Sequence, residues 1–179
     1  MIGYIFKIIW LFLPMGFANM APVLVKKINI LNIPIDFNKK INGIPILGAN
    51  KTIRGLIVAT ILGGIIFLLQ KILFDFEFFK SISIIDYQHI PWFAGMFMGF
   101  GAIFGDAIKS FFKRRFKINP GKSWIPFDQI DYVLGGILFF SWFYVPASID
   151  IVFLLIIGVI LHIIVNIIGY YLGIREQRI

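Results

Sequence analysis

The chain has 179 residues, of which 59% are hydrophobic and 17% aromatic, and its mean hydropathy is +0.90. A soluble domain of this size cannot bury so much apolar surface, so the sequence predicts an integral membrane protein. The lack of cysteine excludes disulfides and any cysteine-based metal site or nucleophile. A net charge of +8 is compatible with nucleic-acid binding, but in a membrane protein it more often reflects cytoplasmic loops and anionic ligands. We therefore expect no nucleic-acid partner.

Five windows are apolar over the length of about 20 residues that a transmembrane helix needs. They cover approximately residues 3–25, 55–74, 91–112, 129–147 and 150–173. The third window is rich in glycine, which favours close helix packing. The connection before the second window mixes Pro, Asn, Gly and Lys and predicts a long loop with a short hairpin. We expect an all-α, polytopic membrane protein with about five transmembrane helices and two basic cytoplasmic loops, forming one membrane-embedded domain over residues 1–179.

Basic residues are distributed unevenly between the two ends of these predicted helices. Fourteen of the 17 Lys and Arg lie near the first connection, near the third connection or in the C-terminal tail. The opposite side carries Lys7, Lys71 and Lys80. By the positive-inside rule, we expect a multi-pass protein of the cell membrane with its amino terminus outside and its carboxyl terminus and basic loops in the cytoplasm.

The segment from Gly105 to Asp131 combines three aspartates and six basic residues between two apolar windows. On a helix, one face carries the residues spaced i, i+3, i+4 and i+7, which here are Asp106, Lys109, Ser110 and Lys113. An acid at the end of an apolar helix is costly unless it is paired or binds a cation, so Asp106 is a functional candidate. Taken alone, Lys113 and Arg114 are compatible with basic side chains that snorkel to the interface.

Two further aspartates stand at the start of the fourth window. Pro126 suits the first turn of a helix, which places Asp128 near its start and Asp131 one turn later on the same side. Helix capping explains Asp128 but not Asp131, and two acids this close repel each other unless a cation or proton intervenes. Together with Asp106, these oxygen ligands predict a divalent metal site.

Two other segments are suited to anions. A turn signal at 119–123 contains Pro120, Gly121 and Lys122, which can present backbone N–H groups and an ammonium to a phosphate. The start of the second window contains Asn50, Lys51, Thr52 and Arg54. Asn50 or Thr52 can cap the following helix, whose free N–H groups form an anion site with the two basic side chains. The alternative for this segment is positive-inside anchoring alone.

These segments resemble the signature of the CDP-diglyceride synthetases, a family of integral membrane cytidylyltransferases. The similar elements are Gly-Asp-x3-Ser-x2-Lys-Arg at 105–114, Pro-Gly at 120–121 and Asp-Gln-x-Asp at 128–131. The small size, the five windows and Asn-Lys-Thr-x-Arg-Gly at 50–55 are more similar to the archaeal branch, the CDP-archaeol synthases. The sequence departs from the bacterial pattern at 122–124, where Lys-Ser-Trp replaces His-Gly-Gly, and at Gln129, which replaces Arg.

The resemblance implies transfer of a cytidylyl group from CTP to an isoprenoid glycerol-phosphate lipid, with Mg²⁺ as cofactor and the bilayer as the site of the reaction. It implies that the metal ligands are Asp106, Asp128 and Asp131. It implies catalytic phosphate contacts from Lys109, Ser110, Lys113 and Arg114. The implied substrate-binding set is Asn50, Lys51, Thr52, Arg54, Pro120, Gly121 and Lys122.

Two other classes of function share part of this pattern. A small ion or phosphate transporter uses acids and bases along a permeation path, but its charges usually lie near the bilayer midplane, often in paired repeats. A non-catalytic scaffold for anionic lipids needs only the basic loops and leaves the three aspartates unexplained.

Overall fold

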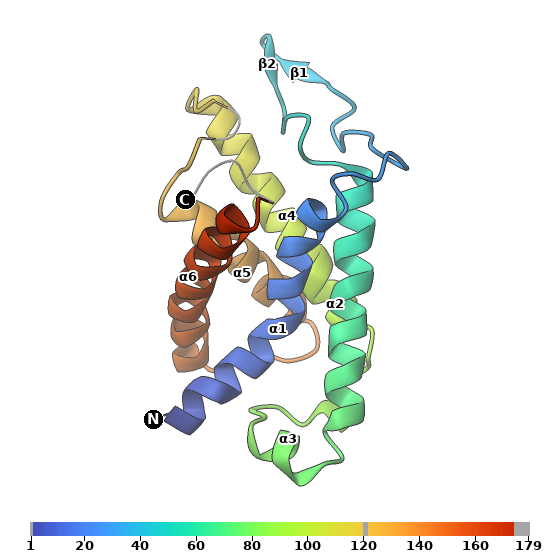
Figure 1. Ribbon diagram of the computed structural model, residues 1–179, viewed down its shortest axis with the longest axis vertical. Helices are drawn as coiled ribbons and strands as arrows, with labels where there is room; N and C mark the ends of the chain where they lie inside the picture. Colours follow the sequence, from blue (N-terminus) through green and yellow to red (C-terminus); the bar gives the residue numbers. More distant parts are fainter. Residues whose placement is uncertain (1, 120–121, 174–179) are drawn as a thin grey trace.

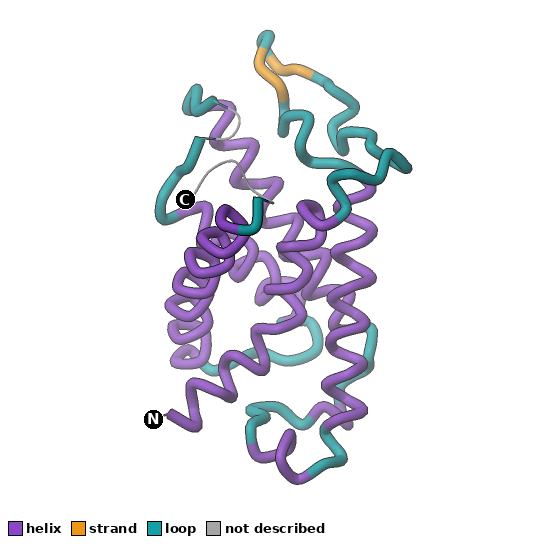
Figure 2. The backbone as a smooth tube through the Cα atoms, viewed as in Figure 1, coloured by secondary structure: helices purple, strands orange, loops and turns teal. Residues whose placement is uncertain are grey.

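The computed structural model describes residues 2–119 and 122–173, and most of them belong to five long helices. These helices are α1 (Ile2–Leu24), α2 (Ile53–Leu73), α4 (Ala94–Arg115), α5 (Phe127–Phe140) and α6 (Ser148–Tyr171). The shorter elements are β1 (Lys40–Ile41), β2 (Ile44–Pro45), α3 (Glu77–Ser81) and a 3₁₀ turn at Tyr87–His89. The two strands form one antiparallel hairpin, which confirms the hairpin expected in the first loop (Figure 2).

The five long helices coincide with the five apolar windows, and α5 differs most from its window. It ends at Phe140, although the apolar run continues to residue 147. The Ser141 hydroxyl donates a hydrogen bond to the Ile137 carbonyl at 2.7 Å, and Pro146 disfavours helical backbone at the residue before it. The 14 residues of α5 are about 21 Å long at the usual helical rise.

Three helices, α1, α2 and α6, are long and apolar enough to cross a membrane. Helix α1 continues through Pro14 and Pro22 rather than breaking at either. Long apolar helices of this kind are typical of a multi-pass membrane protein, in agreement with the predicted fold class.

Helix α4 packs against α1, α2 and α5, and its glycines permit two of these contacts. On the α2 side, a Cβ atom at Gly99 would collide with the backbone of Ala59, and one at Gly95 with the carbonyl of Gly63. On the α5 side, Gly105 approaches the carbonyl of Asp131 closely enough that a side chain there would collide with it. The glycine pattern of the third window therefore has a packing role, as small residues do in membrane helix pairs.

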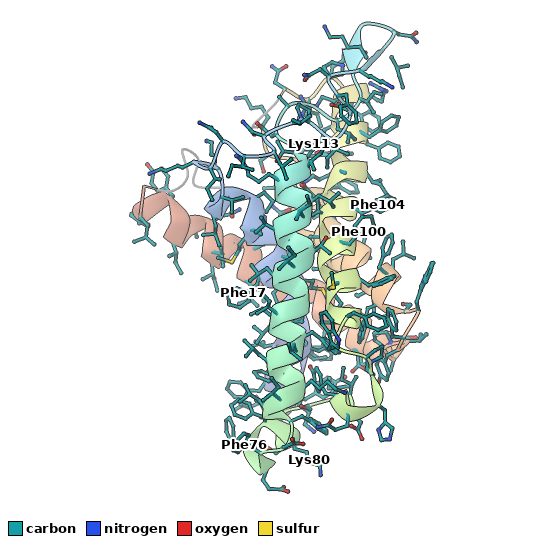
Figure 3. All side chains as sticks on the ribbon, turned by 90° about the vertical axis from the view of Figure 1, so that its right-hand side faces the viewer. Phe17, Phe76, Lys80, Phe100, Phe104 and Lys113 are labelled. Atoms are coloured by element: carbon teal, nitrogen blue, oxygen red, sulfur yellow. The ribbon has the colours of Figure 1, made fainter. Side chains whose placement is uncertain are left out.

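The bundle has two distinct ends (Figure 1). The β1–β2 hairpin and the C-terminal end of α4 lie at one end, which we call the hairpin end, while α3 lies at the opposite end near the chain's amino terminus. A side view places Lys113 at the hairpin end and Phe76 and Lys80 at the other (Figure 3).

The loop between α1 and α2 is folded around Asp36. Its carboxylate accepts hydrogen bonds from the backbone N–H groups of Leu47 at 2.8 Å, Gly48 at 3.2 Å and Asn38 at 3.0 Å. Burial alone would raise the pKa of Asp36, but these N–H donors outweigh it and hold that pKa below its ordinary value. The charged carboxylate therefore fixes the base of the hairpin.

Candidate active site

The hairpin end holds a buried group of opposite charges, which we call the aspartate–lysine cluster. Its members are Lys51, Asp106, Lys109, Lys113, Asp128 and Asp131. Their side chains are between 7% and 21% exposed. Charges buried to this extent are tolerated only when they are paired, so the pairing within the cluster decides its stability.

The ammonium of Lys109 lies among three carboxylates. Its Nζ atom is 2.9 Å from Asp106 Oδ1 and 2.7 Å from Asp131 Oδ2. The same atom is 2.9 Å from Asp128 Oδ1. One ammonium from α4 thus draws together one acid of its own helix and two acids of α5.

Two more lysines neutralise the outer sides of the cluster. Lys51, from the loop before α2, forms an ion pair with Asp106. Lys113 Nζ lies 3.0 and 3.1 Å from the two carboxylate oxygens of Asp128 and also donates to the backbone carbonyl of Lys122. Three separate parts of the chain therefore meet at this site.

Local sequence explains why the groups converge. Asp106 and Lys109 are three residues apart in α4, and Asp128 and Asp131 are three residues apart in α5, so each pair lies on one side of its helix. Because Gly105 lets α4 approach α5 closely, the two pairs face each other. The prediction that both α5 aspartates point the same way is confirmed, since both contact Lys109.

The start of α2 contributes a second basic feature. Thr52 Oγ1 accepts the N–H of Gly55 at 3.2 Å, so Thr52 is the helix cap, whereas Asn50 is exposed. Arg54 is only 8% exposed, and its Nε and Nη1 atoms are buried without a hydrogen-bond partner in the described part of the chain. A buried guanidinium in this condition is costly, which suits it to pairing with an anion. The expectation that the first N–H groups of α2 are free is wrong, because those of Ile53 and Arg54 donate to the carbonyls of Ile33 and Leu31, and that of Gly55 donates to Thr52.

The other predicted site residues are placed differently. Ser110 is buried in α4 beside Lys109, as its spacing predicted. Arg114 lines a separate cavity of about 270 Å³ against the hairpin loop, so it does not join the aspartate–lysine cluster. The Lys122 side chain is exposed, and its backbone carbonyl is the group that reaches Lys113. The predicted residues Pro120 and Gly121 lie outside the described residues.

The donor set of the cluster is compatible with a divalent cation, because three carboxylates are the ligands that a hard cation prefers. Within residues 2–119 and 122–173, no three His, Cys, Asp or Glu side chains are placed to hold a metal ion by themselves. The Lys109 ammonium instead lies between the aspartates. Asp131 Oδ2 is 2.7 Å from that ammonium, but it is buried and accepts no well-aligned hydrogen bond from the described residues. The three carboxylates would fit a cation only if the Lys109 side chain moved from between them.

Two features of the site had no clear signal in the sequence. The role of Asp36 in folding the loop is visible only from its three backbone contacts, although Asn, Pro and Gly around it marked a structured turn region. The close contact of Lys109 with both α5 aspartates depends on how two helices cross, which spacing within one helix does not specify.

Comparisons with known proteins point in the same direction as the motifs. The profile of the CarS-like family, described as CDP-archaeol synthase, matches residues 1–178. The CDP-archaeol synthase of Methanocaldococcus jannaschii is 33% identical over 178 residues, which cover 96% of each chain. That of Methanopyrus kandleri is 33% identical over 175 residues, covering 95% of this chain and 91% of the relative.

A solved structure has a similar fold. It is described as an intramembrane enzyme for archaeal membrane lipid biosynthesis, and it superimposes with a TM-score of 0.65. The two chains are 24% identical, and the match covers 86% of this chain and 91% of the other. The overall fold is thus similar to that of a protein described as an intramembrane enzyme.

Proposed function

The chain belongs to the CDP-archaeol synthase family, and we propose that it transfers a cytidylyl group from CTP to the phosphate of an archaeal isoprenoid ether lipid. Family membership confirms the resemblance seen in the motifs and, with it, a CTP-dependent nucleotidyltransferase of archaeal lipid biosynthesis. The proposed acceptor is 2,3-bis-O-geranylgeranylglycerol 1-phosphate, and the products are the CDP-lipid and pyrophosphate. In this proposal residues 1–179 act as one membrane-embedded domain, and nucleic acid has no part.

The observation that carries the proposal is the convergence of three aspartates and three lysines near the start of α2. There, the buried Nε and Nη1 atoms of Arg54 have no partner among the described residues. In the reaction, an oxygen of the lipid phosphate attacks the α-phosphorus of CTP, and the bond from that phosphorus to the bridging oxygen breaks as pyrophosphate leaves. The lipid supplies the nucleophile, so the protein's contribution is to position two anionic substrates and neutralise their charge.

The residues have separate roles in this proposal. Lys51 and Arg54 bind phosphates at the start of α2 through the charge and N–H donors of their side chains. Lys109, Ser110 and Lys113 bind phosphates from one side of α4. The weaker candidates are Asn50, Thr52, Arg114 and Lys122. Thr52 already caps α2, which leaves it a positioning role.

Asp106, Asp128 and Asp131 are the residues that would hold Mg²⁺. When bound, the ion supplies charge neutralisation and alignment for the phosphate groups. In the structure the three lysines pair with the carboxylates and hold them near one another.

We propose that the chain crosses the membrane five times, with the hairpin end in the cytoplasm. In this arrangement α4 provides the third crossing, and α5 together with residues 141–147 provides the fourth. The two basic connections meet in the structure, since Arg115 Nη1 donates to the Pro45 carbonyl at 3.2 Å. Their shared positive charge supports a cytoplasmic location for the carboxyl terminus and the site, and an outside location for the amino terminus.

The rival expectation of a transporter gains no support from this arrangement. Lys113 of the charged cluster lies at the hairpin end of the bundle (Figure 3), and the cluster includes Lys51 from the loop at that end, as an enzyme with a soluble nucleotide and a lipid headgroup requires. A permeation path instead needs charged groups near the middle of the membrane.

The proposal is tested with purified protein, labelled CTP and the isoprenoid lipid phosphate in matched micelles. We expect Mg²⁺-dependent label in the lipid, release of pyrophosphate and much slower reaction with a diacyl phosphatidic acid. Comparable turnover on the diacyl lipid removes the isoprenoid assignment. Absence of label in every lipid phosphate, from protein that is folded and inserted, overturns the proposed reaction.

A further inference from the structure

The loop between α1 and α2 exposes a group of apolar side chains within residues 28–33, which we call the apolar segment. They belong to Ile28, Ile30, Leu31 and Ile33, each at least 44% exposed, and Ile30 reaches 73%. This segment lies outside the helices, so its exposure is not that of a lipid-facing helix surface. A contiguous exposed apolar patch of this kind typically marks an interaction surface.

Backbone hydrogen bonds hold the apolar segment beside the first turn of α2. The Ile53 N–H donates to the Ile33 carbonyl at 2.9 Å, and the Arg54 N–H donates to the Leu31 carbonyl at 3.1 Å. In Figure 1 the connection that leaves α1 passes the start of α2 and extends to the side of the bundle. Since α1 and α2 are both long and apolar enough to cross a membrane, the segment lies at the level where the bilayer ends.

The backbone at Leu31 adds a second observation. Its φ is +53°, a left-handed conformation that Gly or Asn adopts at lower cost than leucine. The Leu31 side chain is 46% exposed, so burial within the protein does not explain why a leucine stands at this position. Contact with an apolar medium outside the protein does explain it.

Exposed basic side chains flank the apolar segment. Lys27 precedes it, and Lys39 and Lys40 follow it in the same loop. The single acid between α1 and α2 is Asp36, whose carboxylate already accepts three backbone N–H groups. Apolar side chains flanked by lysines are typical of segments that lie in the surface of an anionic bilayer.

We propose that the apolar segment inserts between the headgroups and the hydrocarbon of the leaflet at the hairpin end, where Lys27, Lys39 and Lys40 contact anionic lipid headgroups. The partner is the surface of the same membrane that α1 and α2 cross. The Ile35 N–H donates to the Lys51 carbonyl at 2.7 Å, so the inserted segment also restrains the start of α2. The membrane contact is independent of the proposed reaction, whereas its consequence for phosphate binding by Lys51 rests on the proposed function. A second copy of the chain is the competing occupant.

Two exposed asparagines provide the first test. Asn29 lies within the apolar segment and Asn42 in the turn of the hairpin, so Asn29→Cys and Asn42→Cys can each carry a bimane label in a protein without other cysteines. The labelled protein is placed, one copy per nanodisc, in phosphatidylglycerol and phosphatidylcholine with a nitroxide on the acyl chain near the glycerol. We expect the nitroxide lipid to quench Asn29→Cys strongly and aqueous iodide to quench it weakly, with the opposite order at Asn42→Cys. The same order of quenching at both positions overturns the proposal.

The lipid composition and the number of copies distinguish the possible partners. Discs of phosphatidylcholine alone should weaken the quenching of Asn29→Cys by the nitroxide lipid, because the lysines lose their anionic partners. Unchanged quenching in these discs refutes the preference for an anionic surface. Protection of Asn29→Cys from both quenchers, seen only in discs that hold two copies, assigns the segment to an interface between copies and overturns the proposal.

Hydrogen exchange of the Ile53 and Arg54 N–H groups tests the restraint on α2 without turnover. In the anionic discs we expect Ile30→Ser to speed this exchange about tenfold or more, since burial of one isoleucine side chain shifts an equilibrium by at least that factor. Ile30→Leu should restore slow exchange, and Ile41→Ser, at an exposed position in β1, should leave it unchanged. Because Ile30 is mostly exposed within the protein, a purely structural role predicts no change, and equal exchange in Ile30→Ser and wild type overturns the restraint. Wild-type protein with lipid contact at Asn29→Cys but no cytidylyl transfer keeps the membrane contact and refutes the proposed reaction instead.

Discussion

Lys109 is the residue on which the charge balance of the site depends. Its ammonium lies within 3 Å of an oxygen of each of three aspartates. Lys51 and Lys113 add two positive charges, so three ammoniums oppose three carboxylates. In such a cluster, pairs between aspartates and lysines can be replaced by pairs with bound ions of opposite charge, with little change in total charge. In the proposed reaction, binding of a cation together with CTP would be an exchange of this kind, in which the carboxylates would hold the cation and the lysines the phosphates.

The first prediction concerns the aspartates. Asp128→Asn keeps the shape of the side chain but removes the charge that binds a hard cation and balances Lys109. We expect the rate of cytidylyl transfer to fall on the order of 100-fold or more, and similar losses for Asp106→Asn and Asp131→Asn. The measurement is the initial rate with labelled CTP across a Mg²⁺ series.

Asp75→Asn is the matched control for this series. Asp75 is exposed near the α3 end, where its carboxylate accepts a hydrogen bond from Gln88, so its substitution should cost little. Asp150 is unsuitable as a control because it is buried and accepts hydrogen bonds from Tyr4 and the Ala147 N–H. Near wild-type, Mg²⁺-dependent rates in the three cluster variants would show that these carboxylates are structural.

The second prediction concerns Arg54. Because its buried Nε and Nη1 atoms have no partner in the described residues, Arg54→Gln should leave the thermal stability of the ligand-free protein unchanged or raise it. The stabilisation that CTP adds should shrink, since binding stabilises a protein in proportion to the logarithm of ligand concentration over Kd. Thermal unfolding in detergent with and without CTP measures both effects.

An exposed lysine in the same loop provides the comparison for Arg54. Lys27→Gln removes one positive charge without removing a buried group. Loss of the CTP-induced shift in both variants would mean that the loop attracts CTP only through its overall charge. A destabilised ligand-free Arg54→Gln protein with an intact CTP shift would make Arg54 a structural residue.

At the level of single residues, the sequence predicted which side chains share a helix face better than it predicted which side chains pair between helices. Spacing within α4 and α5 was enough to place Asp106 with Lys109 and Asp128 with Asp131. Contacts between helices could not be predicted from the sequence, since they depend on how α4 and α5 cross. For this reason Lys109 was assigned to phosphates alone, and Arg114 was grouped with a cluster from which the structure separates it.

At the level of elements, the contact of α4 with α5 holds the site together. Gly101 and Gly135 meet backbone to backbone, and Gly105 meets the carbonyl of Asp131, so the two helices approach as closely as glycine allows. The same contact that packs the helices therefore sets the position of an aspartate in the site.

The third prediction follows from this contact. Gly105→Ala places a methyl group against the Asp131 carbonyl, which must move because backbone cannot rotate away. We expect a loss of about 1–3 kcal/mol in stability, as overpacking in a close-packed interior typically costs, and a reduced rate of transfer. Thermal unfolding and the labelled-CTP assay measure the two effects. Gly3→Ala, at a position with open space around it, should leave both unchanged.

The elements themselves were mostly predictable, because long apolar runs predict helices well. Helix α5 was the exception, since hydropathy does not register the hydrogen bond of Ser141 or the effect of Pro146 on the backbone before it. Helix α3 could not be predicted from the sequence either, because a helix of five residues has too little periodicity to be distinguished from a turn.

At the level of the whole molecule, the distribution of basic residues indicates which end of the bundle faces the cytoplasm. Fourteen of the 17 basic residues lie in segments assigned to one side, and the structure brings the first and third connections together at the hairpin end. CTP is a cytoplasmic substrate, so an orientation that exposes this end to the outside is incompatible with the proposed reaction.

The last prediction tests that orientation. Because the chain has no cysteine, a single introduced cysteine is a clean reporter, and Asn42, Ser81 and Ser123 are all exposed. In intact cells, an impermeant thiol reagent should label Ser81→Cys, at the end of α3, and leave Asn42→Cys and Ser123→Cys unlabelled until the membrane is opened. Asn42 and Ser123 belong to different connections, so their equal protection places both basic loops on one side. The reverse labelling pattern would mean that the protein has the opposite orientation. Protection of only one of the two residues would mean that the two basic loops lie on different sides of the membrane, which contradicts the shared site.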